Sequence, residues 1–269
     1  MIADSIIKER DIEKKVLRTI KEFKLISKKD RVAVALSGGK DSVALLYILN
    51  KNFKNVFAII IDEGISRRKA AEEFCIKNKI KYHMFSFKSE FKKTLPEMLK
   101  NTGKNPCSIC GTLRRSLLDK KAALLGATKL ATGHNLDDEV EVFFMNMFKS
   151  NINAMLKQNI KSEKHGFVVK IKPLMFCRNN EIERFVKLKK LAYDKNICRY
   201  QKTAFRKDVR LLLKKYEKKH KNIFKNVLKA IMSKKPKIAA EYNYCEICGR
   251  PSKERICRSC SIILGITKN

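Results

Sequence analysis

The sequence predicts an α/β protein with a doubly wound parallel sheet, followed by a basic helical segment and a cysteine-rich module. Short apolar runs alternate with helical patterns over roughly the first 150 residues, which is typical of such a sheet. Lysine and arginine crowd residues 203–235, and four cysteines in two CxxC pairs occupy 245–260. Ligands of open parallel sheets bind at the carboxyl ends of the strands, so those ends hold the candidate functional residues.

The expected elements follow from hydrophobic spacing. Residues 5–29 have the apolar periodicity of a basic amphipathic helix. The continuous apolar run at 56–62 is typical of a strand buried on both faces of a parallel sheet. Further strands are expected at 32–36 and 81–87, and 128–135 is expected to be a strand that ends in a polar loop. Further helices are expected at 41–50, 66–79, 88–100, 112–125, 137–148 and 203–235, with a cysteine-bearing loop at 105–111.

A glycine-rich turn joins the first strand to the next helix. It consists of Ser37, Gly38, Gly39, Lys40, Asp41 and Ser42, called here the 37–42 loop. Such a turn aims backbone N–H groups at one point, and the helix dipole adds positive potential, as a phosphate site requires. The alternative is an ordinary strand–turn–helix corner. The loop lacks the first glycine and spacer of G-x-x-x-x-G-K-[ST], and resembles instead the PP-loop of the N-type ATP pyrophosphatases.

Charge and hydropathy restrict the partners. The chain has 61 Lys and Arg against 27 Asp and Glu, a formal net charge of +34. Such an excess favours binding to nucleic acid with a strong dependence on salt. A membrane surface is the other polyanion, but we find no lipidation motif, no run of ~20 apolar residues and no apolar signal sequence. We therefore expect a cytosolic protein that does not bind membranes.

Nine cysteines in a cytosolic chain indicate metal, cluster or redox chemistry rather than disulfides. The spacing C-x2-C-x8-C-x2-C near the C-terminus is typical of a tetrahedral zinc site with four protein ligands, which makes the zinc structural. Free thiols or a small iron–sulfur centre are the alternatives there. The four predicted zinc ligands are Cys245, Cys248, Cys257 and Cys260.

The remaining cysteines are ambiguous on spacing alone. Cys107 and Cys110 form a separate CxxC, which fits either a redox pair or half of a zinc site. Cys110 is expected to precede a helix, so the helix dipole, Arg114 and Arg115 would favour its thiolate. Cys198 stands alone far downstream, and Cys75 and Cys177 are expected to be structural.

Polar residues also follow two later strands. Asp62 ends the apolar strand at 56–62, and Gly133 and His134 follow the strand near 130. Asp137 and Asp138 then open a helix, and Asp138 is expected to hold Mg²⁺ beside a bound nucleotide, with Asp41 as a second candidate.

Taken together, these motifs resemble one family over residues ~20–265. SGGKDS, CxxCG-x2-RR, GHN-x-DD, KPL followed by a lone cysteine, and the C-terminal CxxC pairs occur jointly in the tRNA 2-thiouridine synthetases. The resemblance is to the archaeal and eukaryotic cytoplasmic type and to its thermophile relatives that thiolate position 54. It implies the PP-loop fold, similar to the adenine nucleotide α-hydrolases. It also implies a [4Fe–4S] cluster held by Cys107, Cys110 and Cys198, whose open iron carries hydrosulfide.

The same resemblance implies the reaction. ATP binds on the 37–42 loop with Asp62, Gly133 and His134 nearby, and Lys40 and Arg114 neutralise developing charge. The C2 carbonyl of a tRNA uridine is adenylated and its oxygen is replaced by sulfur. Lys40, Asp41 and the three cluster cysteines are the implied catalytic residues. The basic helices and the zinc ribbon are expected to grip tRNA phosphates.

Several points stay open at this stage. Relatives usually begin with another zinc ribbon, but residues 1–30 contain no cysteine, so the docking of tRNA and the uridine modified are undecided. The sulfur donor is free sulfide, a persulfide or a ubiquitin-like thiocarboxylate, and a homodimer is compatible with the sequence. Alternatives are a 2-thiocytidine or lysidine synthetase, or a non-catalytic tRNA-binding zinc protein. The expected units are an N-terminal helix at 1–29, a catalytic domain at 30–200, a basic segment at 201–240 and a zinc ribbon at 241–269.

Overall fold

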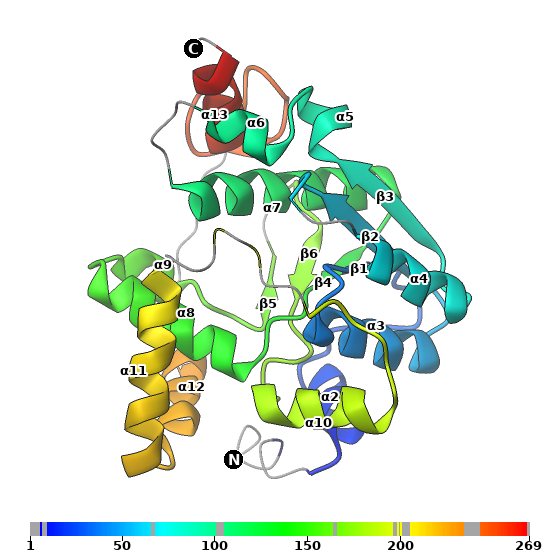
Figure 1. The fold of residues 1–269 in the computed structure, drawn as a ribbon, viewed down its shortest axis with the longest axis vertical. Coiled ribbons are helices and arrows are strands. Elements are labelled where there is room, and N and C mark those ends of the chain that lie inside the picture. Colours follow the sequence, from blue (N-terminus) through cyan, green and yellow to red (C-terminus); the bar gives the residue numbers. More distant parts are fainter. Residues whose placement is uncertain are drawn as a thin grey trace.

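The fold is that of a computed structural model, which describes residues 6, 10–65, 68–100, 105–163, 166–195, 198, 200, 205–233 and 243–267. A six-stranded sheet forms its centre, with the strand order β3-β2-β1-β4-β6-β5 (Figure 1). All strands are parallel except β5 at one edge, which confirms the predicted fold class. The strands are β1 (Val32–Ala35), β2 (Val56–Asp62), β3 (Tyr82–Ser86), β4 (Lys129–Ala131), β5 (Lys161–Ser162) and β6 (Val169–Ile171).

Two hydrophobic cores cover the two faces of the sheet. One core packs against α2 (Ile12–Glu22), α3 (Lys40–Asn52), α4 (Lys69–Lys77) and α10 (Asn179–Leu188). The other packs against α5 (Phe87–Phe91), α6 (Leu95–Leu99) and α7 (Pro106–Leu124), which lie on the opposite side in Figure 1. The strand order reverses around β1, so the loops after β1 and β4 meet at the switch point where such folds bind ligands.

A helical hairpin extends from this frame and packs on α8 (Leu136–Phe148) and α9 (Ile152–Leu156) (Figure 1). It consists of α11 (Phe205–Lys219) and α12 (Ile223–Ser233), where the sequence predicted a single helical stretch. Glu141 of α8 fastens it by accepting hydrogen bonds from Arg206 Nε at 2.7 Å and Arg210 Nε at 2.6 Å. The parts of the predicted stretch at 203–204 and 234–235 lie outside the described residues.

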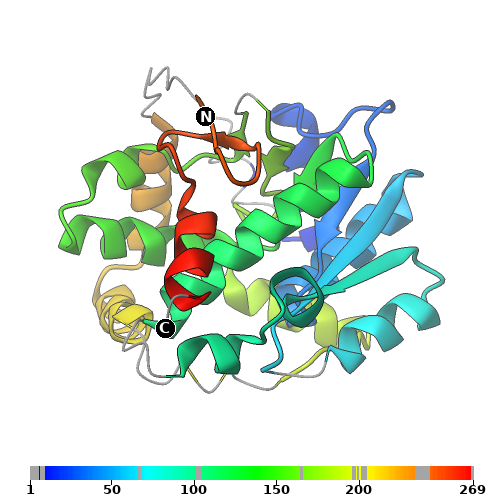
Figure 2. The same cartoon turned by 90° about the horizontal axis from the view of Figure 1, so that it is seen from above.

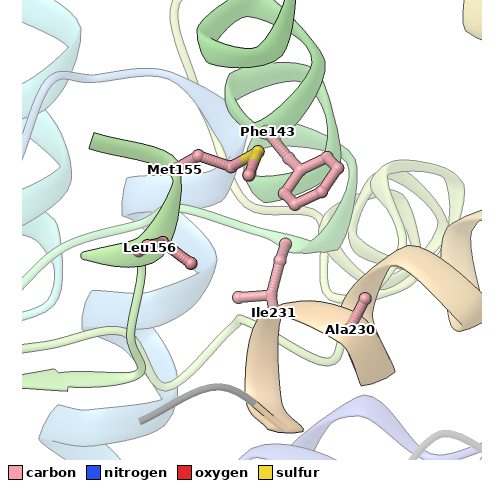
Figure 3. Close-up of a pocket in the computed structure, with 5 residues that line it drawn as sticks. All are labelled: Phe143, Met155, Leu156, Ala230 and Ile231. Carbon is pink, nitrogen blue, oxygen red and sulfur yellow. The ribbon is translucent and has the colours of Figure 1, made fainter. Parts of the chain in front are cut away.

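An apolar gap remains where the hairpin meets α8 and α9. It is lined by Phe143, Met155, Leu156, Ala230 and Ile231, whose side chains face one another in Figure 3. Its volume is about 10 Å³, room for at most about one water. It presents no polar side chain to a ligand, so it is a packing gap.

Three expected boundaries were wrong. The predicted N-terminal helix at 5–29 is shorter, because α2 ends at Glu22 and Lys24 adopts a left-handed φ of 47°; residues 5 and 7–9 lie outside the described residues. The predicted helix at 88–100 is two short helices, broken at Lys92 and restarted by a capping box between Thr94 and Glu97. The predicted division into domains at 30, 201 and 241 stays a prediction.

The third correction concerns the cysteines. The loop expected at 105–111 is the start of α7, because the Asn105 side chain accepts a hydrogen bond from the Ser108 backbone N–H at 3.1 Å and Pro106 occupies the first helical turn. Cys107 and Cys110 therefore lie on the first turns of a long helix.

The C-terminal module is a small hairpin of β7 (Asn243–Tyr244) and β8 (Pro251–Ser252), followed by α13 (Arg258–Thr267). Figure 2 shows α13 running beside α7. Among the described residues, no helix is long and apolar enough to cross a membrane.

Candidate active site

The 37–42 loop is held in shape by its own hydrogen bonds. Ser42 Oγ accepts a hydrogen bond from the Ser37 backbone N–H at 3.2 Å and donates to the Gly39 carbonyl at 2.9 Å. Gly38 has a φ of +84°, which side chains rarely adopt, and Gly39 caps the N-terminus of α3. The loop therefore places consecutive backbone N–H groups at a helix N-terminus, the arrangement that binds phosphate.

The loop after β4 packs directly on this turn. A β-carbon built on Gly133 would lie 2.9 Å from the Ser42 nitrogen and 3.1 Å from the Asp41 carbonyl carbon. Both are backbone atoms, so only glycine allows the two segments to approach this closely. This contact brings the predicted residues of the two strand ends together.

Two carboxylates meet across this contact. Asn135 donates from Nδ2 to Asp41 Oδ1 at 3.0 Å, and its Oδ1 accepts from the Asp138 backbone N–H at 2.9 Å. Arg206 Nη2 donates to Asp138 Oδ1 at 2.8 Å. Burial raises the pKa of Asp138 to about 6 against the opposing charge of Arg206, and the charge of Asp41 adds to the increase. Asn135 therefore links Asp41 at the start of α3 to the first turn of α8, which carries Asp138.

The other predicted nucleotide residues are placed as follows. Lys40 Nζ donates to Asp41 Oδ1 at 2.6 Å and contacts Asn179 Oδ1. His134 Nδ1 lies 2.9 Å from Thr132 Oγ1; its side chain reaches solvent, yet the protein around it, helped by the charge of Lys172, lowers its pKa to about 4. We therefore treat His134 as neutral near pH 7.

Asp62 has a local role at the end of β2. Its Oδ1 accepts a hydrogen bond from the Gly64 backbone N–H at 2.9 Å. This bond shapes the turn that carries Glu63, so Asp62 orders one wall of the site.

A buried glutamate joins the 37–42 loop to the cysteine helix. Glu63 is fully buried, pairs with Arg68, and accepts from Arg114 Nη1 at 3.4 Å. Arg68 in turn donates from Nη1 to the Ser37 carbonyl at 2.6 Å and from Nε to the Ile61 carbonyl at 3.1 Å. The side chains of Arg68, Glu63 and Arg114 thus form a continuous bridge, called here the Glu63 bridge, from the loop to α7.

The three cysteines implied by the resemblance lie at the far end of this bridge. Burial raises the pKa of both Cys107 and Cys110, and the charge of Cys198 acts on both thiols in the same direction, as that of a neighbouring group does. Cys107 Sγ also lies 3.7 Å from the Tyr200 carbonyl oxygen. The structure thus brings the three thiols into one neighbourhood; that they bind a cluster stays a prediction.

Arg114 favours the Cys110 thiolate as expected, but burial outweighs this effect. Burial raises its pKa to about 11, and the positive charge of Arg114 opposes this only in part. Cys110 is therefore a thiol at neutral pH in the protein without metal, and metal binding there must release a proton.

The four C-terminal cysteines form a second set. Their sulfur atoms all lie within 4.8 Å of one another, and Cys248 Sγ is 3.7 Å from Cys257 Sγ. Metal–sulfur bonds of about 2.3 Å in a tetrahedron place the sulfurs about 3.8 Å apart, so the set fits a metal site. Burial alone would raise the pKa of Cys245, but backbone N–H donors, that of Cys257 foremost, lower it to about 6.

This module docks on the cysteine helix. Arg250 donates from Nη1 to the Ser116 carbonyl at 2.7 Å and also contacts the Ser116 hydroxyl. Arg258 Nη2 donates to Ser108 Oγ at 3.3 Å, and Ser108 lies between Cys107 and Cys110. Cys107 and Cys110 on α7 and Cys260 on α13 therefore stand on helices that pack side by side, as Figure 2 shows.

Sequence reasoning missed three residues of this site. Glu63 follows Asp62 at a strand end, which is a usable signal. Arg68 and Arg206 belong to basic stretches with many equivalent side chains, so their contacts could not be found from the sequence. Cys75 and Cys177, expected to be structural, are both fully buried.

Comparison with known proteins places these features in a family. A model of the PP-loop domain matches residues 8–216. The chain is 30% identical to cytoplasmic tRNA 2-thiolation protein 1 of Caenorhabditis elegans, covering 96% of this chain and 73% of that protein. It is 32% identical to tRNA-5-methyluridine(54) 2-sulfurtransferase of Pyrococcus horikoshii, covering 92% and 83%.

A solved structure gives the same result. The U34-tRNA thiolase NcsA from Methanococcus maripaludis, solved with its [4Fe–4S] cluster, superimposes with a TM-score of 0.82 at 30% identity. The match covers 94% of this chain and 87% of that one. On its domain, its fold and these relatives, the chain belongs to the family of PP-loop tRNA-thiolating sulfurtransferases.

Proposed function

We propose that this protein is an ATP-dependent tRNA sulfurtransferase that converts a uridine to 2-thiouridine. The observation that carries the proposal is the Glu63 bridge, which joins an ATP-type loop to a helix with two of three neighbouring cysteines. Adenylation and sulfur transfer need both sites at one base, and the family relationship gives the same chemistry. Other PP-loop enzymes need the loop but not the cysteines.

The first step is activation of the base. ATP binds with its phosphates on the N–H groups of the 37–42 loop, and the uridine O2 attacks the α-phosphorus while pyrophosphate leaves. Lys40 and Arg114 offset the negative charge that develops. An amide-like oxygen leaves poorly by itself, and its esterification to AMP makes it a good leaving group.

The second step replaces that oxygen. A sulfur nucleophile attacks C2, and the C2–O bond breaks with its electron pair on the oxygen, which departs as part of AMP. Burial raises the pKa of Cys107 and Cys110, and the positive charge of nearby Arg114 opposes that increase. The same charge attracts an anionic sulfur species to this place. Free sulfide, a persulfide and a protein thiocarboxylate are the donors to compare.

Cys107, Cys110 and Cys198 would hold a [4Fe–4S] cluster. The donor set fits, because three thiols from α7 and a distant segment lie together beside a cationic side chain, and all three are at least partly accessible. A cluster with three protein ligands leaves one iron able to bind the sulfur that is transferred. The protein's part is to supply three thiolates, and the protons of Cys107 and Cys110 leave on assembly.

Two further metals belong to the proposal. Asp41 and Asp138 would hold Mg²⁺ beside the phosphates, and the cation would exchange with Lys40 and Arg206, which pair with these carboxylates in the free protein. The four C-terminal thiols would hold Zn²⁺, with no open position for catalysis.

The substrate is tRNA, bound mostly through phosphates on the basic hairpin and the C-terminal module. The relatives act on different uridines, U34 in one and position 54 in another, so the chain is expected to modify one of these two. The C. elegans relative is named as a cytoplasmic protein, which supports the same location here.

The test is nucleoside mass spectrometry. Protein reconstituted anaerobically with iron and sulfide is incubated with unmodified tRNA, with and without ATP, and the tRNA is digested. 2-Thiouridine that depends on ATP supports the proposal, and tRNA with U34 or U54 changed to cytidine identifies the position. A 2-thiocytidine or lysidine product, or tRNA binding without any product, overturns it.

A further inference from the structure

An open hollow lies at the turn between α11 and α12, away from the catalytic loop. Its volume is about 460 Å³, and its lining includes two rings, Tyr216 and His220. These rings stack with centroids 5.9 Å apart and planes inclined by 28°. Tyr216 is 51% exposed, so a flat group has access to this stack from solvent.

The rest of the lining is polar at the rim and apolar below. Asn222 and Asn226 lie one helical turn apart. Among the described residues, neither side-chain amide has a hydrogen-bond partner. Ile223 and Val227 are partly buried and supply apolar surface. Lys221 completes the rim, so aromatic faces, amides and a cation border one space.

We propose that this hollow binds an unpaired nucleobase of the tRNA, an inference that rests on the proposed function. A base stacks on aromatic rings through its face, and asparagine amides offer both donors and acceptors to its edge. The lysine is placed for the adjoining phosphate. This contact with a base differs in chemistry from the phosphate contacts that the basic helices are expected to make.

Charge favours RNA over a protein as the occupant. Lys221 lines the hollow, and further exposed lysines crowd the last two turns of α11 beside it, namely Lys214, Lys215, Lys218 and Lys219. A protein interface is depleted of lysine at its core, whereas single-stranded nucleic acid binds where aromatic rings lie in a positive groove.

The position along α11 separates this base from the target. Arg206 at the start of the helix bonds to Asp138 in the active site, and Tyr216 lies ten residues farther along, about 15 Å. The base bound here is therefore not the uridine that reacts. It belongs to another unpaired nucleotide of the same tRNA and fixes the orientation in which the substrate docks.

The test compares tRNA affinity and its salt dependence. Loss of one stacked base weakens binding by about 5- to 150-fold, so Tyr216→Ala should bind tRNA that much more weakly and Tyr216→Phe within about 3-fold of wild type. The slope of log affinity against log salt should not change for Tyr216→Ala, because no phosphate contact is lost. For Lys221→Ala the slope should become shallower by ~0.7–0.9, because one phosphate contact is lost.

Leu211→Ala is the matched control, because it removes an exposed side chain, 56% accessible, from another face of the same helix. It should bind as wild type, and circular dichroism verifies that each variant keeps its helices. If Tyr216→Ala binds tRNA as wild type does, the base site is refuted although thiolation still proceeds. If it lowers the salt slope as Lys221→Ala does, the hollow contacts phosphate and the inference is wrong. If wild type neither binds nor thiolates tRNA, the proposed function itself fails.

Discussion

Gly133→Ala tests the contact on which the active site depends. Its new β-carbon would lie 2.9 Å from the Ser42 nitrogen and 3.1 Å from the Asp41 carbonyl carbon. Carbon atoms pack best at about 3.5–4.0 Å, so one segment must retreat by at least about 0.5 Å. Neither atom is the end of a flexible side chain, so the shift falls on the backbone of the 37–42 loop and of the first turn of α3.

The magnitude follows from that displacement. Overpacking of this kind costs about 1–3 kcal/mol, which lowers the midpoint of thermal unfolding by roughly 2–10 °C for a chain of this size. A misplacement near 1 Å at a reacting site costs on the order of 10²-fold in rate. We therefore expect a folded protein whose ATP affinity falls and whose ATP-dependent thiolation falls by about 10-fold or more.

Gly111→Ala is the matched glycine substitution. Its β-carbon would meet Arg115 Nη1 at 3.1 Å, the movable end of a side chain, and alanine is favoured over glycine inside a helix by about 1 kcal/mol. Its unfolding midpoint should therefore hold or rise. Calorimetry of both variants and ATP titration of Gly133→Ala are the measurements. A Gly133→Ala protein with wild-type stability and ATP affinity would refute the reasoning.

Four other outcomes are expected. Gly38→Val and Gly39→Val should abolish ATP-dependent thiolation and leave tRNA affinity intact, because a side chain enters the phosphate cradle; normal turnover would disprove the loop assignment. Cys245→Ser should lose about one zinc per chain by metal analysis, and an unchanged zinc content would contradict the four-thiolate site. Alanine at Cys107, Cys110 or Cys198 should remove both the iron, about four per chain, and thiolation, whereas Cys75→Ala and Cys177→Ala keep both; full activity of iron-free protein would rule the cluster out. Removing the charge of several exposed lysines should make the slope of log tRNA affinity against log salt shallower by up to ~0.9 per lost phosphate contact, and an unchanged slope would place the tRNA footprint elsewhere. The lysines to change are Lys214, Lys215, Lys218, Lys219 and Lys221.

The sequence was most informative where apolar runs were long. β1 and β2 were predicted because they are short, nearly continuous apolar runs, and in the structure almost all of their residues are buried. The loop between β1 and α3 was predicted from its glycines. The strand β5 spans only two residues, too few to form a pattern, and was not predicted; β6 was missed as well, although it is as long as β4. The start of α7 was missed because Asn105 and Pro106 are typical both of loops and of helix caps.

The individual side-chain contacts between distant segments could not be predicted from the sequence. Nothing in the spacing of Cys198 places it beside Cys107 and Cys110, and only the family resemblance implied it. The Glu63 bridge depends on two arginines selected from many by the geometry of β2 and α7. Pairing of charges across the fold is decided by tertiary structure, whereas apolar periodicity is decided locally.

The docking of the C-terminal module gives a reason for the structural metal that we propose there. Fewer than thirty residues cannot bury a core by themselves, so we expect four thiolates and a metal to order them. Once ordered, the module packs Ile262 and Ile263 against the core that α7 shares. Arg250 and Arg258 then bond to Ser116 and Ser108 of the same helix. The helix that presents Cys107 and Cys110 is thus held from one side by the Glu63 bridge and from another by the module, which fixes both thiols relative to the ATP loop.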